Sequence, residues 1–348
     1  MRLRVGFAGF GAAGRFFHAP FVAAAGMEVA AIASSRKAEI AAVFPDARVV
    51  ADFDALLAVA DLDLVVIVTP NACHVDQVRA ALEAGRHVVV DKPATPTRVE
   101  AEGLADLADA RGLKLGVHHN RRFDSDFLTA SRVLGDGVLG EIVALRMNWD
   151  RYRPEATGRW RDRAAPASGN LYDLGSHMID QVLMLVGMPD WVQADVFAQR
   201  PGGETDDGFE ILMGQGQRRI TLGVSLISTA PRDRFRLEGR NGLFRKAGLD
   251  CQEDQLRAGL DPLAAGFGEE PEGQWGEIVA PDGSVSRVVP ETGRWLTFYE
   301  RMRQAIEGTG EVPVTMRSAG RTIGLIEAAH AAAREGRRVH LDADGRWS

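Results

Sequence analysis

The pattern Gly9-Phe10-Gly11-Ala12-Ala13-Gly14 constrains the fold of this chain more than any other stretch. It follows a short apolar segment, residues 3–8, that is typical of a strand, and it opens a helix-like segment, residues 12–25. In this context the first glycine makes a tight turn, the second lets the backbone approach a pyrophosphate, and the third lets helix and strand pack closely. The helix N-terminus adds N–H groups that favour anions. The pattern therefore predicts a dinucleotide site at Gly9, Phe10, Gly11, Ala12, Ala13 and Gly14.

Strand-like and helix-like segments alternate through the first third of the chain. The last of these helices has both ends marked, because Thr97 with Glu100 fits a capping box and Gly112 fits a C-terminal stop. Near-continuous Val and Ile in the strands favour a parallel sheet covered on both faces. The predicted strands are 3–8, 29–33, 64–68, 87–90 and 113–117. The predicted helices are 12–25, 51–60, 74–84 and 98–111.

The pattern changes beyond about residue 120, where longer strands follow one another with short turns. No crossover helix separates the later strands, so their pairing is expected to be mostly antiparallel. Residues 263–294, rich in Gly, Pro and Glu, are expected to form an extended loop or flap. We therefore divide the chain into a first domain, 1–121, and a second domain, 122–348. The second contains predicted strands 141–150, 192–199, 208–214, 218–228 and 235–238, and predicted helices 294–307 and 318–335.

Composition excludes several classes of protein. The chain has 348 residues and a formal net charge of −7, with no basic block, which argues against a nucleic-acid partner. Its apolar runs are shorter than the ~18 residues of a membrane span, and a signal peptide is not expected because glycines replace an apolar core near the N-terminus. Two cysteines, Cys73 and Cys251, do not make a disulfide framework, so the expected location is the cytoplasm.

The residues after the second predicted strand indicate which cofactor is preferred. NAD binding usually needs an acidic residue there, whereas this chain has Ser34, Ser35 and Arg36. Hydroxyls and a guanidinium suit the 2′-phosphate of NADP(H), which is therefore predicted over NAD(H). A solvated loop without a ligand, and use of NAD(H), are the alternatives.

Two further triplets follow strands at the edge where open parallel sheets bind ligands. Thr69-Pro70-Asn71 follows the third predicted strand, and Asp91-Lys92-Pro93 follows the fourth. Asn71 is suited to hydrogen-bond a ribose or nicotinamide, while Lys92 is either a functional cation or an exposed loop residue. Pro20 is expected to break the first helix near Ala19, and beside this break His18 either lines the site or is a buried structural histidine.

A second cluster lies in an apolar helix that runs toward Gly187. Asp173 and His177 are four residues apart and so share one face of an α-helix. A histidine accepts protons near neutral pH, and a nearby carboxylate orients it. An ordinary surface pair is the alternative. No metal is predicted, because no further His or Cys stands at ligand spacing from this pair.

Taken together, these motifs resemble the Gfo/Idh/MocA oxidoreductases over essentially the whole chain. The family triplet usually has Glu where this chain has Asp91. Residues 17–20, 119–127, 160–161 and 246–250 are similar to one branch that includes NADP-dependent scyllo-inositol dehydrogenases. The resemblance implies an α/β protein, with an N-terminal Rossmann domain followed by an α/β domain that has a large, mostly antiparallel sheet. It also implies a homodimer or homotetramer formed through that sheet.

The resemblance assigns catalysis to Lys92, Asp173 and His177. His177 is expected to be the base, Lys92 to stabilise charge on the reacting oxygen, and Asp173 to bind substrate hydroxyl and hold its neighbours. A polyol or sugar is the expected substrate, and a non-catalytic regulator or an epimerase or glycosidase with tightly held NAD are the alternatives. Further cofactor contacts are expected from Thr69, Pro70, Asn71, His74, Asp91, Lys92, Pro93 and Asn120, and pocket-wall contacts from Arg121, Arg151, Tyr152, Trp160 and Arg161.

Overall fold

The computed structural model describes residues 2–156 and 163–347, which form two compact units. The first unit combines residues 1–120 with 252–267 and 294–320, and the second combines 121–251 with 268–293 and 321–348. The chain first leaves the first unit at Asn120, one residue before the end of the first predicted domain, and two later segments return to it. The domain boundary after residue 121 stays a prediction.

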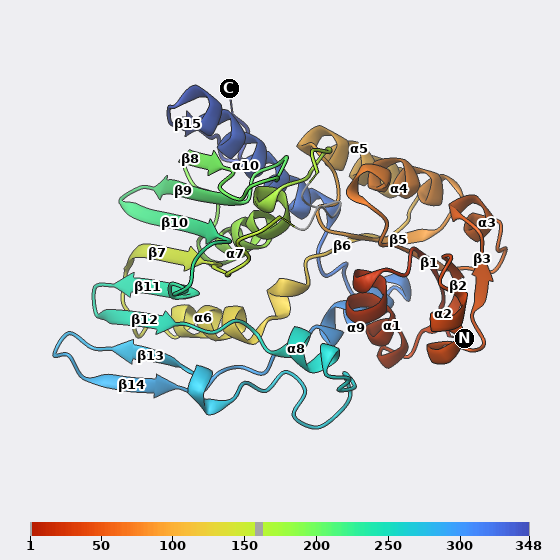
Figure 1. Cartoon of the computed structure of the whole chain (residues 1–348), viewed down its shortest axis with the longest axis horizontal. Coiled ribbons are helices and arrows are strands. Elements are labelled where there is room, and N and C mark those ends of the chain that lie inside the picture. Colours follow the sequence, from red (N-terminus) through yellow and green to blue (C-terminus); the bar gives the residue numbers. More distant parts are fainter. Residues whose placement is uncertain (1, 157–162, 348) are drawn as a thin grey trace. The chain divides into compact units, whose positions relative to one another are not determined.

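The first unit is built on a six-stranded parallel sheet in the order β3-β2-β1-β4-β5-β6 (Figure 1). This is the strand order of a Rossmann fold, as predicted. All four residues of β4 are fully buried, as are Val88, Val89 and Val90 of β5, which accounts for their continuous apolar sequence. The strands are β1 (Arg4–Ala8), β2 (Glu28–Ala33), β3 (Arg48–Val50), β4 (Leu64–Ile67), β5 (His87–Asp91) and β6 (Leu115–His118).

Helices connect these strands. The predicted capping box of Thr97 and Glu100 is present at the start of α5, and the predicted stop at Gly112 has a positive φ of 64°. Helix α10 belongs to the first unit up to Gly320 and to the second from Arg321. The α-helices of this unit are α1 (Ala19–Ala24), α2 (Lys37–Val43), α3 (Phe53–Leu57), α4 (His74–Glu83), α5 (Arg98–Ala110), α8 (Gln252–Arg257), α9 (Leu296–Ile306) and the start of α10 (Met316–Glu335).

The second unit is built on a nine-stranded sheet in the order β14-β13-β12-β11-β7-β10-β9-β8-β15. Its neighbouring strands pair antiparallel, except that β7 and β10 are parallel, so the prediction of a mostly antiparallel sheet is confirmed. The strands are β7 (Ile142–Asn148), β8 (Trp191–Phe197), β9 (Gly208–Gln215), β10 (Arg218–Ser225), β11 (Phe235–Gly239), β12 (Gly242–Lys246), β13 (Gly276–Val279), β14 (Val285–Val288) and β15 (Val339–His340).

The predicted loop at residues 263–294 is wrong for part of its length, because it contains the hairpin β13–β14. Gly283 forms its turn with a φ of 84°. Three of the four β14 residues are exposed, so an edge strand of this kind lacks the apolar alternation by which a sequence marks strands.

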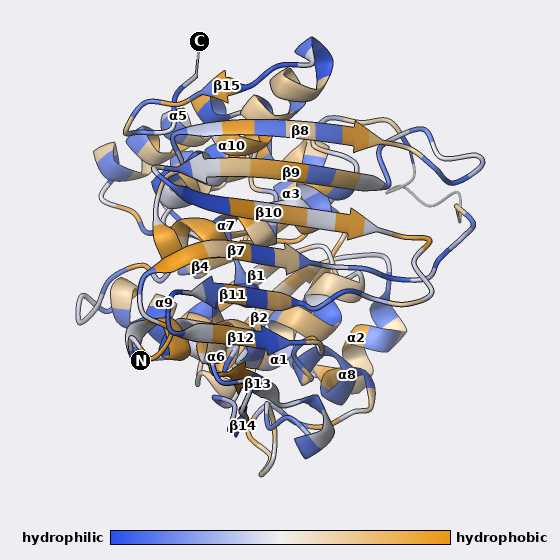
Figure 2. Ribbon diagram, turned by 90° about the vertical axis from the view of Figure 1, so that its left-hand side faces the viewer, coloured by the Kyte–Doolittle hydropathy of each residue, from blue (hydrophilic) through white to orange (hydrophobic). Residues whose placement is uncertain are grey.

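Helices cover one face of the nine-stranded sheet. Figure 2 looks onto the other face, with the strands in front and α6, α7 and α10 behind them. Side chains that point to the helices form the core, including Phe209, Ile211 and Met213 of β9. Between them Glu210 is exposed and Leu212 is half-buried, so β9 alternates between a buried and an open face. The helices of this unit are α6 (Ser125–Gly135), α7 (Ser176–Val186) and the remainder of α10.

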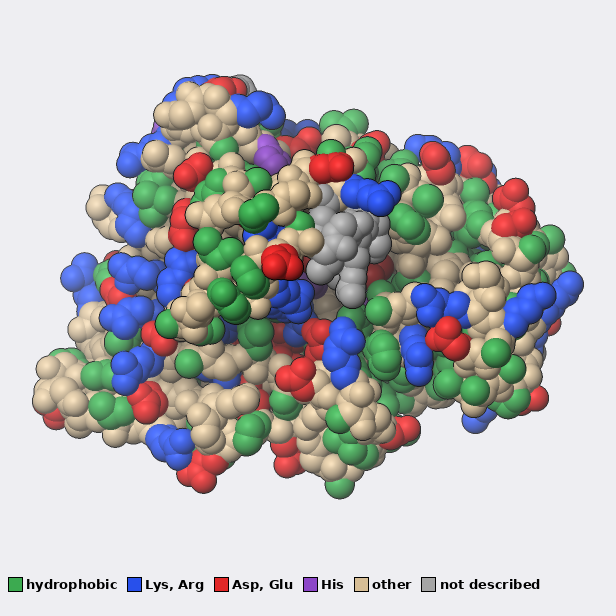
Figure 3. Space-filling view, viewed as in Figure 1, with side chains coloured by type: hydrophobic (Ala, Val, Ile, Leu, Met, Phe, Trp, Pro, Cys, Tyr) green, Lys and Arg blue, Asp and Glu red, His purple; other side chains and the backbone are tan. Residues whose placement is uncertain are grey.

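Charges of both signs are interspersed on the molecular face shown in Figure 3. Within the described residues, the helices are too short or too polar to cross a bilayer.

Candidate active site

The glycine turn after β1 has the geometry that each predicted role requires. Gly9 has a φ of +99°, and a Cβ there would lie 3.0 Å from the carbonyl oxygen of Val68. A Cβ at Gly14 would lie 3.1 Å from the Gly9 carbonyl oxygen, so only glycine allows this close packing. A Cβ at Gly11 would meet nothing within 4 Å, which leaves open space above the backbone. These residues therefore fit a dinucleotide pyrophosphate.

The helix after this turn starts with a π-helical turn, Ala13–His18, and continues as α1. The Ala19 N–H donates to the carbonyl oxygen of Gly14, five residues earlier, and Pro20 occupies the first turn of α1. The predicted break near Ala19 is thus confirmed, and it turns the fully buried His18 into the interior of the first unit.

Two arginines meet at one carboxylate beyond the end of β2. Arg36 Nη1 lies 3.1 Å from Glu39 Oε1, and Arg15 Nη1 lies 3.2 Å from Glu39 Oε2. The Ser34 hydroxyl accepts the backbone N–H of Arg36 at 3.2 Å. Ser34 and Arg36 were predicted from the sequence, whereas Arg15 and Glu39 were not; the position of Arg15 directly after Gly14 was the available signal. The pair of guanidiniums can hold an anionic group here.

His74 joins the loops that follow β4 and β5. Its Nδ1 lies 2.9 Å from the Pro93 carbonyl oxygen and its Nε2 lies 3.0 Å from that of Thr69. Burial lowers the pKa of His74, although Asp91 and the two carbonyls oppose this effect. A neutral ring donates only one of these contacts at a time. The ring positions the two loops, and its contact with a cofactor stays a prediction.

Asp91 and Lys92 occupy the end of β5. The Lys92 N–H donates to Asp91 Oδ1 at 2.8 Å, and the Lys92–Pro93 peptide bond is cis. Burial would raise the pKa of the Asp91 carboxyl, but the ring of His18 and further positive charge hold it well below its usual range. The carboxylate thus stays charged beside Lys92.

Three possible metal ligands lie together in this unit. One donor atom each from His18, Asp91 and His118 falls within 4.8 Å of the others. This cluster was not predicted, because its members are far apart along the chain. The pairing of Asp91 with His118 across β5 and β6 brings two of them together.

The predicted catalytic helix also starts with a π-helical turn, Leu171–Gly175, before α7. Asp173 is half-buried on the π turn, and His177 is buried in the first turn of α7. A continuous α-helix was expected, and the π turn changes the angle between the two residues. The helix ends as predicted at Gly187, which has a φ of 82°.

Asp206 fixes the start of this helix. Its Oδ2 accepts the Leu171 N–H at 2.8 Å, and its backbone carbonyl accepts the Asn170 N–H at 3.1 Å. A Cβ at Gly169 would lie 1.9 Å from Asp206 Oδ1, so a side chain there would displace the carboxyl group. The sequence indicated no role for Asp206.

Three arginine side chains lie against the ring of Trp149, which is next to His177. Its buried ring lies 6.1 Å from the His177 ring, measured between centroids. The guanidinium carbons of Arg121, Arg151 and Arg234 lie 5.0, 5.5 and 4.8 Å from its centroid. Trp149 and Arg234 were not predicted from the sequence.

The remaining predicted residues divide between the units. Tyr152 is 60% exposed, and Asn120, which ends the first unit, is buried. Trp160 and Arg161 lie outside the described residues. The structure thus brings the glycine turn and residues 34–36, 69–71 and 91–93 to the carboxyl ends of neighbouring strands in the first unit. It brings Arg121, Arg151, Asp173 and His177 into the second.

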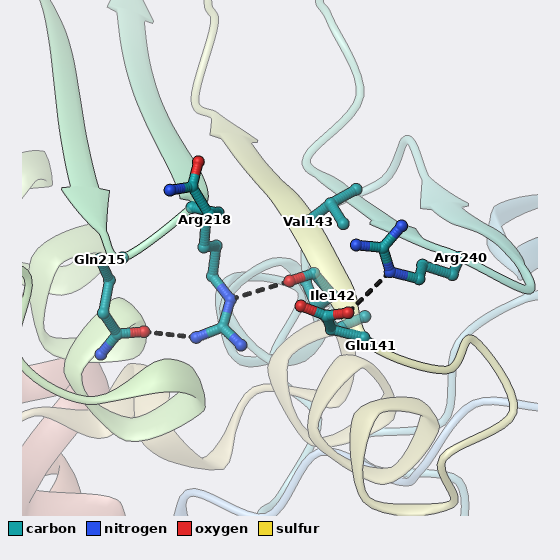
Figure 4. Close-up of a pocket in the computed structure, with 8 residues that line it drawn as sticks. Glu141, Ile142, Val143, Gln215, Arg218 and Arg240 are labelled. Atoms are coloured by element: carbon teal, nitrogen blue, oxygen red, sulfur yellow. Dashed lines mark hydrogen bonds and ion pairs between the residues drawn. The ribbon is translucent and has the colours of Figure 1, made fainter.

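A hollow of about 320 Å³ lies over the ends of strands β7, β9 and β10 (Figure 4). Arg218 Nε donates to the Ile142 carbonyl oxygen at 3.1 Å, and Arg240 Nε lies 2.7 Å from Glu141 Oε2. Its lining contains none of the predicted site residues, and its charged groups pair with neighbours, so it is a poor candidate for the active site.

Comparison with known proteins shows the family of this chain. Residues 3–119 match the family model "Oxidoreductase family, NAD-binding Rossmann fold", and residues 132–341 match the model of its C-terminal alpha/beta domain. Scyllo-inositol 2-dehydrogenase (NADP(+)) IolW of Bacillus subtilis is 37% identical and covers 98% of this chain and 96% of the relative. D-xylose 1-dehydrogenase (NADP(+)) 2 of Haloferax volcanii is 28% identical and covers 93% of this chain and 95% of the relative. The solved structure of the oxidoreductase YvaA from Bacillus subtilis has a TM-score of 0.95, at 36% identity over 98% of each chain.

Asp206 makes stability depend on pH. Burial raises its pKa from 3.8 to about 6 in the folded protein, against the opposing hydrogen bonds. The folded state therefore holds this proton more tightly, and its contribution favours folding below about pH 4 and is lost as the pH rises toward 6. In the wild type, this titration should lower the free energy of unfolding by up to about 3 kcal/mol between pH 4 and pH 7. Asp206→Asn should remove this decrease, as measured by urea denaturation. Asp195→Asn, which changes an exposed side chain of β8, is the matched control. Parallel pH curves for wild type and Asp206→Asn would contradict the assignment.

Proposed function

Because the chain belongs to the Gfo/Idh/MocA family of oxidoreductases, we propose that it is an NADP(H)-dependent dehydrogenase of cyclic polyols or sugars. The observation that carries this proposal is the likeness, over 98% of the chain, to a relative named an NADP-dependent scyllo-inositol dehydrogenase. The relative named a D-xylose dehydrogenase supports the same class of substrate, a ring or chain of secondary hydroxyls. Free Cys73 and Cys251 support a reducing cytoplasm as its location.

The first unit supplies the groups that would hold the cofactor. The turn from Gly9 to Gly14 would bind the pyrophosphate through backbone N–H groups, and Arg15 and Arg36 with Ser34 would bind the 2′-phosphate. When bound, the nicotinamide accepts or donates the hydride.

The proposed chemistry assigns one role to each catalytic residue. His177 takes the proton of the substrate hydroxyl during oxidation and returns it during reduction. The Lys92 ammonium hydrogen-bonds the same oxygen and stabilises the negative charge that develops on it. Asp173 binds a substrate hydroxyl and holds Lys92 or His177 in place. Arg121 and Arg151, stacked on Trp149, supply donors for further hydroxyls beside His177.

The first test is NADP⁺ reduction over inositols, pentoses, hexoses and sugar acids. We expect turnover with at least one polyol or sugar. His177→Ala and Lys92→Ala should each lower kcat by well over about tenfold, because each removes a group that acts in the chemical step. His340→Ala and Lys114→Ala, which change residues outside the proposed site, are the matched controls.

Three results would contradict this assignment. Absence of turnover with any compound would favour a nucleotide-binding regulator. A cofactor that co-purifies and never dissociates would favour an epimerase or glycosidase. Near-full turnover by His177→Ala would refute the assignment of His177 as the base.

The second test concerns cofactor choice. Arg36→Ala should weaken NADP⁺ binding by about tenfold or more and leave NAD⁺ binding unchanged, since it removes a charge-assisted contact to the 2′-phosphate. Glu39→Gln should tighten NADP⁺ binding, because the carboxylate that Arg15 and Arg36 now share repels the phosphate. Fluorescence titration with both nucleotides measures this, with exposed Arg79→Ala as control. Equal affinity of the wild type for NADP⁺ and NAD⁺ would refute the preference.

We further propose that the open face of the nine-stranded sheet joins copies of this chain into a homodimer or homotetramer. This face presents half-buried Leu212 close to an ion pair between Glu210 and Arg232, a mixture that suits a self-complementary contact. Leu212→Arg should shift the protein to monomer in sedimentation equilibrium, because it places a long cation on that face. Val99→Arg, which changes an exposed side chain of α5, is the control. A wild type that is monomeric at micromolar concentration would disprove the proposal.

A further inference from the structure

A series of polar contacts, which we call the Tyr299–His18–Asp91 network, leads to Lys92 inside the first unit. The Tyr299 hydroxyl lies 2.5 Å from His18 Nδ1, and His18 Nε2 lies 3.7 Å from Asp91 Oδ1. That same carboxylate oxygen accepts the Lys92 N–H at 2.8 Å. The Tyr299–His18–Asp91 network therefore connects helix α9, the helix break before α1 and the end of β5 to the backbone N–H of Lys92, a proposed catalytic residue.

The side chains of the Tyr299–His18–Asp91 network have little freedom to move. His18 and Tyr299 are fully buried, and the His18 ring lies against the buried ring of His118, with 4.0 Å between centroids. His118 lies opposite Asp91 in the register of β5 and β6 and also contacts Phe298. Packing on every side thus fixes the histidine ring that faces the carboxylate.

The polar atoms of the Tyr299–His18–Asp91 network are compatible with one arrangement of hydrogen atoms. In the tautomer in which Nδ1 of His18 accepts the Tyr299 O–H, Nε2 carries the ring hydrogen and faces Asp91 Oδ1 at 3.7 Å. Burial raises the pKa of Tyr299 well above its usual value, with Asp91 adding to the effect, and keeps this hydroxyl a donor. Burial also lowers the pKa of His118 far below its usual value, so this neighbour stays neutral.

We propose that His18 is a positioning residue that orients Lys92 through Asp91. The role follows from the contacts, since a carboxylate held from behind by an immobile ring holds the N–H of the next residue in one direction. The inference rests on the proposed catalytic role of Lys92, but the restraint on the Lys92 backbone exists independently of any substrate. It also explains why a buried polar ring occupies the helix break, where an apolar side chain would pack without needing partners.

A metal ion is the competing occupant of the cluster formed by His18, Asp91 and His118. The contacts favour the positioning role, because Asp91 Oδ1 already accepts the Lys92 N–H. The His18 and His118 rings also pack against each other, with 4.0 Å between their centroids and a tilt of 42° between their planes. Metal analysis of the purified full-length protein belongs to the test for this reason.

The first experiment measures the Lys92 amide directly and needs no enzymatic activity. Pro93 has no amide hydrogen, so hydrogen exchange with fragmentation to single residues isolates the Lys92 N–H. His18→Leu should speed its exchange by about tenfold or more, and Asp91→Asn should also speed it. His18→Gln retains a donor and an acceptor and should stay close to wild type. His340→Leu, in exposed β15, is the matched control.

The second experiment separates positioning from general damage. His18→Leu should lower kcat by about tenfold or more, with NADP⁺ affinity and KM changed less than about twofold, and His18→Gln should restore most of the loss. In a Lys92→Ala background, His18→Leu should cause no further loss, because both changes act through one group. Tyr299→Phe, which keeps the ring and removes only the hydroxyl, provides the same comparison if His18→Leu does not fold.

The outcomes distinguish this inference from the proposed function. Unchanged Lys92 exchange in folded His18→Leu and Tyr299→Phe overturns the inference and leaves the dehydrogenase proposal intact. Faster exchange in a protein that turns over no polyol or sugar supports the restraint and refutes the proposed function. Stoichiometric metal that is lost in His18→Leu overturns the inference in favour of a metal site.

Discussion

Burial of both faces of β1, β4 and β5 is the constraint on which the first unit depends. Strands that are apolar throughout fit only the middle of a parallel sheet, and parallel strands deliver their carboxyl ends to the same edge. The turn after Gly9, the loop after β4 and the Asp91–Lys92 pair therefore lie on adjacent strands, although they are far apart along the chain. Loops at such an edge need internal restraints. His74 provides one by hydrogen-bonding to backbone carbonyls of two loops, and His18 provides another by facing the Asp91 carboxylate at 3.7 Å. The histidines of this unit are thus part of what holds the proposed site in shape.

Two of the helices that carry proposed functional residues begin with a π-helical turn. In the first, Pro20 lacks an N–H and cannot continue the hydrogen-bond ladder of the preceding turn, so the chain changes helix type at His18. In the second, the wide turn ends at Gly175, where a Cβ would lie 2.7 Å from the Leu171 side chain and 3.3 Å from the Phe209 ring. The absence of a side chain lets this helix lie close to the sheet. A widened turn at each helix start re-aims one or two side chains without disturbing the packing of the rest of the helix.

Local signals in the sequence predicted those features that depend on neighbouring residues. The glycine turn, the capping box at Thr97 and the helix break at Pro20 each follow from a few consecutive side chains, and each has the expected geometry. The features that sequence reasoning missed depend on partners distant along the chain. Asp206 and Trp149 carry no local pattern, and their roles exist only after the second sheet has formed. The β13–β14 hairpin was missed for a different reason, since three of the four residues of edge strand β14 are exposed and the strand lacks an apolar face.

The residues that resemble one branch of the family have a structural explanation that is separate from catalysis. Lys246 and Glu270 form a fully buried ion pair at 2.6 Å, and the Ser125 hydroxyl hydrogen-bonds the same Glu270 carboxylate. The backbone N–H of Ser125 donates to Asp250 Oδ2 at 2.8 Å, which ties the start of α6 to the segment after β12. Replacing Lys246 or Glu270 alone leaves the other charge buried without its partner, at a cost of several kcal/mol, so these two residues can change only together. Such motifs therefore report a shared way of packing the second unit, and they support a family assignment more strongly than they support any particular substrate.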